Sequence, residues 1–314
     1  MQKGKPPHRS RMISSRVLAT ACGVILLIIT SAMGVQVSNN VITWGENTPE
    51  WNRLLHLGGL RLGCSDPPSG CADYAQHDSK TQGVDKVFLG ILLKPDQTPA
   101  YVREYSQLSL NHPALYEVGF DDFVGQCERQ KLPMPAMSEL LNGIAIGVKA
   151  VNPKLHFGIT VYEDELASSQ FPLSGLDPEF RQSVDFVHLY PHYRKEAMSF
   201  SAAMQQAKVI FPSAKIVAGV YAYDRRDYLP CARGSSTPCT NQEEISLFEQ
   251  SFKERLGMLG NSGVDWIEFY PGDFGAENHW ELWKQPRMCR AERLQECTEN
   301  TKAMRDIVRK TLNP

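Results

Sequence analysis

Short β-rich runs alternate with amphipathic stretches along most of the chain after residue 40. Eight runs have the length and residue types of strands, and each is followed by a segment that can form a helix. This alternation predicts a parallel sheet, and eight strand–helix units in about 275 residues fit an α/β fold of the (β/α)8 barrel type. The expected strands lie at 41–44, 59–63, 86–93, 116–120, 155–162, 185–190, 215–223 and 265–270.

The alternative architecture is an open, doubly wound parallel sheet. Nucleotide-binding proteins of that kind carry a GxGxxG or P-loop motif after the first strand. No such motif follows the run at 41–44, so the closed barrel is the preferred prediction. The expected helices include 49–57, 137–151, 201–211, 241–259 and 290–312.

A targeting segment precedes the expected barrel. The first 16 residues contain five basic residues and no acidic one, and an uncharged apolar run of 19 residues follows from Val17 to Val35. That length lies between a long signal-peptide core and a short membrane span, so a cleaved signal peptide and an uncleaved anchor both remain open. We expect residues 1–35 to be this segment and residues 36–314 to form one barrel domain. In both cases the domain is extracytoplasmic: secreted, periplasmic or anchored by residues 17–35.

Export permits disulfide bonds, and six of the eight cysteines lie in pairs close in sequence. The pairs are Cys64/Cys71, Cys231/Cys239 and Cys289/Cys297. The first two pairs lie in segments rich in Pro, Gly and Ser that can curl back on themselves. The third pair would be roughly 12 Å apart on one continuous helix, whereas a bridge requires Cα atoms within about 7 Å. Either Cys289 precedes the helix, or one member of the third pair bonds to Cys127.

The charge balance argues against a nucleic-acid partner. The chain has 33 basic and 35 acidic residues, a net charge of -2, without the basic excess that phosphate backbones require. The sequence also lacks a CxxC motif or a paired-histidine spacing typical of zinc sites. We therefore expect no cofactor and no nucleic acid, and contact with a membrane only through the N-terminal segment if it is uncleaved.

Polar and small residues collect on one alternating face of each expected strand. In a closed barrel, one face of a strand packs against helices and the other points into the lumen. Because aliphatic residues occupy the opposite parity, we assign the polar face to the lumen, whose C-terminal mouth holds the active sites of barrel enzymes. The lumen set includes Arg61, Glu117, Asp121, Thr160, Tyr162, Asp164, His188, Tyr190, His192, Tyr221, Tyr223, Glu268 and Tyr270.

Several of these residues also have a structural explanation. A histidine in mid-strand, as His188 is, more often has a structural hydrogen-bonding role than a catalytic one. Asp121 and Asp122 could cap the amides of the following loop, and the tyrosines could simply fill the lumen. Glu268 is harder to explain in this way, because an unpaired carboxylate in a buried strand is costly.

Carboxylates surrounded by aromatic side chains suit carbohydrate chemistry. Two carboxyl groups flank the glycosidic bond in most glycoside hydrolases, and flat aromatic faces stack on sugar rings. Trp44, Trp280 and Trp283 would lie at or beyond the mouth and could extend such a platform.

At the level of architecture, residues 40–312 resemble the broad superfamily of (β/α)8-barrel glycoside hydrolases. The run FDDF at 120–123 resembles the paired aspartates that end the fourth strand in O-GlcNAcase-type hexosaminidases. This resemblance implies that the substrate-assisted chemistry of those enzymes falls on Asp121 and Asp122. The chitinase-like DxxDxDxE pattern is absent, as is the Asn-Glu ending of the fourth strand of the large retaining-glycosidase clan, although Arg61 resembles an arginine of that clan.

We expect an exported carbohydrate-active barrel, a glycoside hydrolase in which Asp121 and Asp122 lie nearest the scissile bond and Glu268 is the second carboxyl group. The alternative is a non-catalytic carbohydrate-binding barrel. A third interpretation is a divalent-cation site formed by Asp121, Asp122 and Asp164. The expected substrate-binding residues are Arg61, Tyr162, Asp164, Tyr190, His192, Tyr221, Tyr223, Asp224 and Tyr270.

Overall fold

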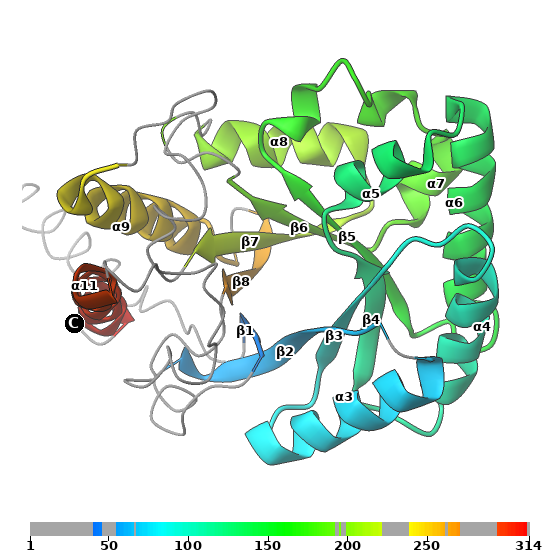
Figure 1. Cartoon of the computed structure of the whole chain (residues 1–314), viewed down its shortest axis with the longest axis horizontal. Helices are drawn as coiled ribbons and strands as arrows, with labels where there is room; N and C mark the ends of the chain where they lie inside the picture. Colours follow the sequence, from blue (N-terminus) through cyan, green and yellow to red (C-terminus); the bar gives the residue numbers. More distant parts are fainter. Residues whose placement is uncertain are drawn as a thin grey trace, which may run out of the picture. The chain divides into compact units, whose positions relative to one another are not determined.

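Eight parallel strands form a closed barrel in chain order, and β8 pairs with β1 (Figure 1). The computed structural model describes residues 40–45, 55–65, 67–191, 195, 199–221, 239–260, 263–270 and 294–312. The strands are β1 (Val41–Trp44), β2 (Leu57–Gly63), β3 (Val87–Ile91), β4 (Leu115–Phe120), β5 (His156–Tyr162), β6 (Phe186–Tyr190), β7 (Lys215–Tyr221) and β8 (Val264–Tyr270). The predicted (β/α)8 barrel is confirmed, and the open doubly wound sheet is excluded.

Helices surround the strands, and α9 packs beside α11 (Figure 1). The helices are α3 (Pro68–Gln82), α4 (Thr98–Leu108), α5 (Phe123–Gln130), α6 (Met134–Val148), α7 (Pro178–Ser183), α8 (Phe200–Ile210), α9 (Asn241–Gly257) and α11 (Leu294–Leu312). The four later helices predicted from the sequence are confirmed to within a few residues. The helix expected at 49–57 falls mostly outside the described residues, and Leu57 already belongs to β2.

Local signals in the sequence explain where several helices begin. The Thr240 hydroxyl and the Glu243 carboxylate form a reciprocal capping box at the start of α9. Ser199 caps α8 by accepting a hydrogen bond from the Ala202 amide. Pro68 opens α3, because a proline at the first helical position forgoes only an amide that has no partner there.

The two faces of the strands bury different kinds of side chain. The outward face is aliphatic and aromatic, with Val118 and Ile159 fully buried against the helices. The lumen near the N-terminal ends of the strands is closed by a second apolar cluster, which we call the lumen floor. It consists of Ile42, Phe88, Phe186, Val217 and Trp266. Polar lumen side chains therefore lie above this floor, toward the C-terminal mouth.

The disulfide predicted between Cys64 and Cys71 is confirmed, with Cα atoms 5.9 Å apart. The sequence suggested a loop across this segment, but α3 begins at Pro68, so the bond joins the end of β2 to the first turns of α3. Cys239 is also disulfide-bonded, while its predicted partner Cys231 lies outside the described residues. Cys127 is a buried free thiol, so it is not the partner of a member of the third pair.

The predicted signal peptide or membrane anchor lies outside the described residues, as does the boundary near residue 36. Within the part of the chain that the structure describes, no helix is both long and apolar enough to cross a membrane.

Candidate active site

A network of opposite charges occupies the centre of the lumen. His188 on β6 lies between Glu117 on β4 and Glu268 on β8, and all three side chains are buried. Its Nε2 is 3.1 Å from both carboxylate oxygens of Glu117, and its Nδ1 is 2.7 Å from Glu268 Oε2. Carboxylates only accept hydrogen bonds, so an imidazole between two of them donates from both nitrogens, as an imidazolium. Burial and Arg61 lower the pKa of His188, but the two glutamates outweigh them and raise it.

Glu268 is an anchored anion. Its Oε1 accepts hydrogen bonds from Trp44 Nε1 at 2.9 Å and from the Tyr190 hydroxyl at 2.5 Å. Its Oε2 faces His188 and lies 3.7 Å from Arg61 Nη1. Burial raises the pKa of Glu268, but His188 and Arg61 together hold it down at about 2. The side chain therefore stays ionised, with both oxygens occupied by protein donors.

Arg61 connects this network to the mouth of the barrel. The side chain is 1 % exposed, and its Nη2 donates a hydrogen bond of 2.6 Å to Thr160 Oγ1. Its guanidinium lies 5.1 Å from the centre of the Trp44 ring, a cation–π contact. Within the described part of the chain, Nε and Nη1 of Arg61 have no hydrogen-bond partner. Arg61 is thus a buried cation with donors available to an anionic or polar neighbour.

Asp121 and Asp122 follow directly after β4, at the mouth. Asp121 is partly buried and Asp122 is exposed. Burial raises the pKa of Asp121, and Asp122 adds to the shift, whereas Arg61 and the Thr160 hydroxyl oppose it. Asp121 therefore keeps its proton to a higher pH than an ordinary aspartic acid. The two adjacent carboxyl groups are in different environments, which is the condition for distinct acid and base roles.

The backbone of Asp122 turns its carboxylate away from the helix that follows. Its φ of 44° lies in the left-handed region, which aspartate tolerates better than most residues. Asp122 precedes α5 but makes no side-chain capping bond. Instead its Oδ1 accepts a hydrogen bond of 2.6 Å from the Tyr162 hydroxyl. The interpretation of Asp122 as a cap for the amides that follow the strand is therefore wrong.

Gln126 of α5 fixes the backbone of this pair. Its Nε2 donates hydrogen bonds to the carbonyl oxygens of Asp121 and Ile91, and its Oε1 accepts from the Leu93 amide. The side chain is buried, so one amide group ties the end of β4 to the end of β3. No sequence signal pointed to Gln126, because it lies in a helix outside the strand alternation.

Four aromatic side chains from consecutive strands line the mouth in a continuous series, which we call the aromatic wall. Ring centres are 5.3 Å apart for Tyr190 and Tyr221, 6.1 Å for Tyr221 and Tyr270, and 5.6 Å for Tyr270 and Trp44. Gly219 makes room for this arrangement, because a Cβ at that position would lie 2.3 Å from the Tyr190 ring. The wall comes from β6, β7, β8 and β1.

The structure brings most of the predicted site residues into contact with one another. Arg61, Tyr190 and Glu268 belong to the buried network, Asp122 contacts Tyr162, and Tyr221 and Tyr270 belong to the aromatic wall. Asp164 lies beyond β5, at the start of a short 3-10 turn. Those outside the described residues are His192, Tyr223 and Asp224, together with Trp280 and Trp283 of the proposed platform.

Strand parity places Glu117, Thr160 and His188 in the lumen, on the same face as Arg61 and Glu268, although they are not among the site residues predicted from the sequence. Among the residues that the structure describes, no group of three or more His, Cys, Asp or Glu side chains is arranged to hold a metal ion. Asp121, Asp122 and Asp164 thus do not form the cation site considered from the sequence.

Comparison with known proteins shows a similarity of fold. No family model and no curated protein matches the chain. A GH113 β-1,4-mannanase has a TM-score of 0.52 at 8% identity, over 85% of this chain and 97% of the mannanase. A GH18 chitinase from Pseudoalteromonas aurantia has a TM-score of 0.47 at 12% identity, over 77% of this chain and 97% of the chitinase.

A Bacteroides uniformis β-glucuronidase has a TM-score of 0.49 at 14% identity, over 74% of this chain. The match spans only 30% of the β-glucuronidase. The shared feature is the barrel. At these identities the likeness shows the (β/α)8 barrel fold alone, and it selects no family.

Proposed function

We propose that this chain is a glycoside hydrolase whose reaction takes place at the mouth of the barrel, beside Asp121 and Asp122. The observation that carries the proposal is the pair itself, at the C-terminal end of a barrel strand. One carboxyl group is partly buried with a raised pKa, and the other is exposed with its Oδ1 bonded to Tyr162. Barrel enzymes place their catalytic groups at this end of the strands.

The two carboxyl groups have complementary roles in this proposal. Asp121 retains its proton and donates it to the leaving-group oxygen as the general acid. Through its Oδ2, Asp122 accepts a hydrogen bond from the substrate or from the attacking group, since the Tyr162 hydroxyl occupies Oδ1. The glycoside hydrolase barrels with which the fold compares, and the resemblance of the FDDF run to O-GlcNAcase-type hexosaminidases, support this choice of chemistry.

Glu268 is predicted from the sequence as the second catalytic carboxyl group, and we propose instead that it acts through its neighbours. The side chain is fully buried and four protein groups surround its oxygens. We assign it to positioning Arg61, Trp44 and Tyr190, which face the mouth. The other polar and aromatic groups of the mouth bind the sugar, by stacking and by hydrogen bonds. This assignment covers Arg61, Tyr162, Tyr190, Tyr221 and Tyr270, and extends as a prediction to Asp164, His192, Tyr223 and Asp224.

The proposal includes an extracytoplasmic location for the barrel domain. The Cys64–Cys71 disulfide and the bonded Cys239 support an oxidising compartment. The basic, apolar N-terminal sequence supports export, by a cleaved signal peptide or by an anchor.

The decisive experiment screens the purified protein for turnover of p-nitrophenyl glycosides and for binding to a glycan library. Turnover by the wild type that is lost in Asp121→Asn and Asp122→Asn supports the proposal. Glycan binding without turnover by the wild type supports the alternative, a carbohydrate-binding barrel without catalysis. Turnover that survives both substitutions contradicts the assignment of the pair.

A further inference from the structure

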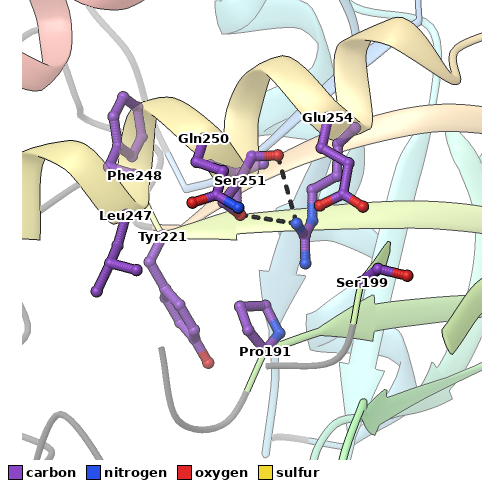
Figure 2. Close-up of a pocket in the computed structure, with 10 residues that line it drawn as sticks. Pro191, Ser199, Tyr221, Leu247, Phe248, Gln250, Ser251 and Glu254 are labelled. Atoms are coloured by element: carbon purple, nitrogen blue, oxygen red, sulfur yellow. Dashed lines mark hydrogen bonds between the residues drawn. The ribbon is translucent and has the colours of Figure 1, made fainter. Parts of the chain in front are cut away.

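A cavity separate from the Asp121–Asp122 pair lies between α9 and the C-terminal ends of β6 and β7 (Figure 2). Its volume is about 380 Å³, within the range of roughly 300–1,000 Å³ that is typical of small-molecule sites. Pro191, after β6, and Tyr221, at the end of β7, form one side. The other side is α9, through Leu247, Gln250, Ser251 and Glu254.

The α9 side combines apolar contact with open hydrogen-bonding groups. Its four residues are spaced three and four apart, so they share one face of the helix, and Figure 2 shows Leu247, Gln250 and Glu254 on the side toward Tyr221 and Pro191. The Gln250 amide is exposed and makes no hydrogen bond within the described residues. Glu254 Oε1 accepts from the Phe200 amide at 2.8 Å, which leaves Oε2 available.

A buried cation is among the residues that line the cavity. Arg255 is 2 % exposed and forms an ion pair with Glu163. Its Nη1 donates to Ser251 Oγ at 2.7 Å, and its guanidinium lies 4.3 Å from the centre of the Phe200 ring. Among the described residues, Arg255 Nε has no hydrogen-bond partner.

The charge around the cavity selects the kind of ligand. The charges of Arg255 and Glu163 cancel within their ion pair, so the Glu254 carboxylate gives the cavity lining a net negative charge. A negatively charged lining disfavours anionic ligands. Apolar surface from Leu247, Pro191 and the Tyr221 ring fits the C–H face of a sugar, while Gln250 offers both a donor and an acceptor to its hydroxyl groups.

Tyr221 connects this cavity to the mouth of the barrel. It lines the cavity, and its ring also contacts Tyr190 and Tyr270 in the aromatic wall. Tyr221 therefore belongs both to the lining of the cavity and to the aromatic wall.

We propose that the cavity is a secondary subsite that binds a neutral sugar residue of an oligosaccharide whose scissile linkage lies at the mouth. The proposal rests on the proposed function for the mouth, and it adds that the substrate is an uncharged oligosaccharide rather than a single sugar.

The test measures binding by calorimetry, so it does not depend on turnover. The probes are cellotetraose, chitotetraose, mannotetraose and maltotetraose, each with its monosaccharide, and tetragalacturonate as an anionic probe. All measurements use the full chain with Asp122→Asn, which by the proposed function slows hydrolysis about 10²-fold or more. Gln250→Ala and Glu254→Gln test the subsite. Gln242→Ala is the matched control, because Gln242 is an exposed glutamine of the same helix that does not line the cavity.

We expect at least one neutral tetrasaccharide to bind more tightly than its monosaccharide. Gln250→Ala should weaken that tetrasaccharide about five- to tenfold, the loss expected for one hydrogen bond. Monosaccharide affinity and the Gln242→Ala control should stay at the reference value. Tetrasaccharide binding that is unchanged in Gln250→Ala and Glu254→Gln, no binding of any tetrasaccharide, or a preference for tetragalacturonate overturns the proposal.

The two proposals fail in different ways. A tetrasaccharide that binds through Gln250 but is never hydrolysed by the chain with its native Asp122 leaves the subsite standing and overturns the hydrolase. Hydrolysis of p-nitrophenyl monosaccharides, with no gain in affinity for a longer substrate, leaves the hydrolase standing and overturns the subsite.

Discussion

The imidazole of His188 lies 2.7 Å from Glu268 Oε2 through Nδ1, and its opposite nitrogen lies 3.1 Å from Glu117. One ring thereby joins β4, β6 and β8 across the centre of the lumen. With Arg61 beside Glu268, two cations balance two carboxylates. Such a network is costly to desolvate, and it becomes destabilising when one partner is removed, because the remaining charges are left buried and unpaired.

The first prediction is that His188→Gln strongly destabilises the barrel. Loss of the imidazolium leaves two buried carboxylates without their shared partner, and we expect the free energy of unfolding to fall by about 3–5 kcal/mol. Urea denaturation at neutral pH measures this change. His77→Gln is the control, since the His77 side chain is 73% exposed, and it should cost at most about 1 kcal/mol. Similar losses in the two variants would contradict a network role for His188.

The second prediction concerns the dependence of stability on pH. The pKa of His188 is raised above 6.5, so its contribution is complete below that pH and is lost as the pH rises through the raised pKa. The pKa of Glu268 is lowered from 4.5 to about 2, so its contribution is complete above 4.5 and is lost as the pH falls toward 2. Urea unfolding as a function of pH should show the free energy of unfolding falling both as the pH drops from 4.5 toward 2 and as it rises through the raised pKa of His188.

The His188→Gln variant should lack the alkaline decline assigned to the imidazole. A variant with the same alkaline decline as the wild type would assign that decline to another group.

Strand alternation predicted the barrel well because it depends only on local sequence. Parity placed Glu117, His188 and Glu268 in the lumen for the same reason. It could not show that they touch, because contact across a barrel depends on the stagger between strands. Here Glu117 pairs with His156, and His188 pairs with Thr160, four residues further along β5. The Glu117 carboxylate crosses β5 at Gly158, where a Cβ would lie 2.1 Å from its Oε1.

Other features depend on tertiary context that the sequence does not carry. The segment around Cys71 has the composition of a loop, but burial of Cys71 and Ala75 stabilises α3 there. Gln126 lies on a helix, and its contacts with β3 and β4 follow from packing alone. The left-handed backbone of Asp122 likewise determines that its carboxylate meets Tyr162 instead of capping α5.

The third prediction is that Gly219→Ala displaces Tyr190. The added methyl group would lie 2.3 Å from the Tyr190 ring, and the ring is packed among buried neighbours, so we expect a loss of about 1–3 kcal/mol. Gly143→Ala in α6 is the control, because its methyl group meets no atom within 4 Å and should stabilise the helix by roughly 0.5–1 kcal/mol. Thermal unfolding measures the change in stability of each variant. An equal change in the two variants would show that the Tyr190 ring moves aside without cost.

The fourth prediction concerns the cysteines from residue 36 onward. Denatured, unreduced protein should show few free thiols, with Cys127 among them, and native protein should protect Cys127 because burial raises its pKa to about 12. Cys71→Ser should cost about 2–3 kcal/mol, as expected for a loop of this length. Thiol titration with and without denaturant provides the count. Seven free thiols from residue 36 onward would overturn the extracytoplasmic location.

The last prediction tests the aspartate pair directly. Asp122→Asn removes the charge and keeps the shape, so turnover of an identified glycan substrate should fall by about 10²-fold or more with little change in unfolding, because the side chain is exposed. Tyr162→Phe removes the hydrogen bond to Oδ1 and should reduce kcat by about tenfold. Asp96→Asn is the control, an exposed aspartate on the loop after β3, and it should keep wild-type kinetics.

The pKa of Asp121 is raised, so a general acid at this position remains protonated to a higher pH, and activity should fall as the pH rises through that pKa. Asp121→Asn should lose both turnover and this alkaline limb of the kcat/KM profile. Wild-type rates in both aspartate variants, or an unchanged alkaline limb in residual Asp121→Asn activity, would show that the acid lies elsewhere in the mouth.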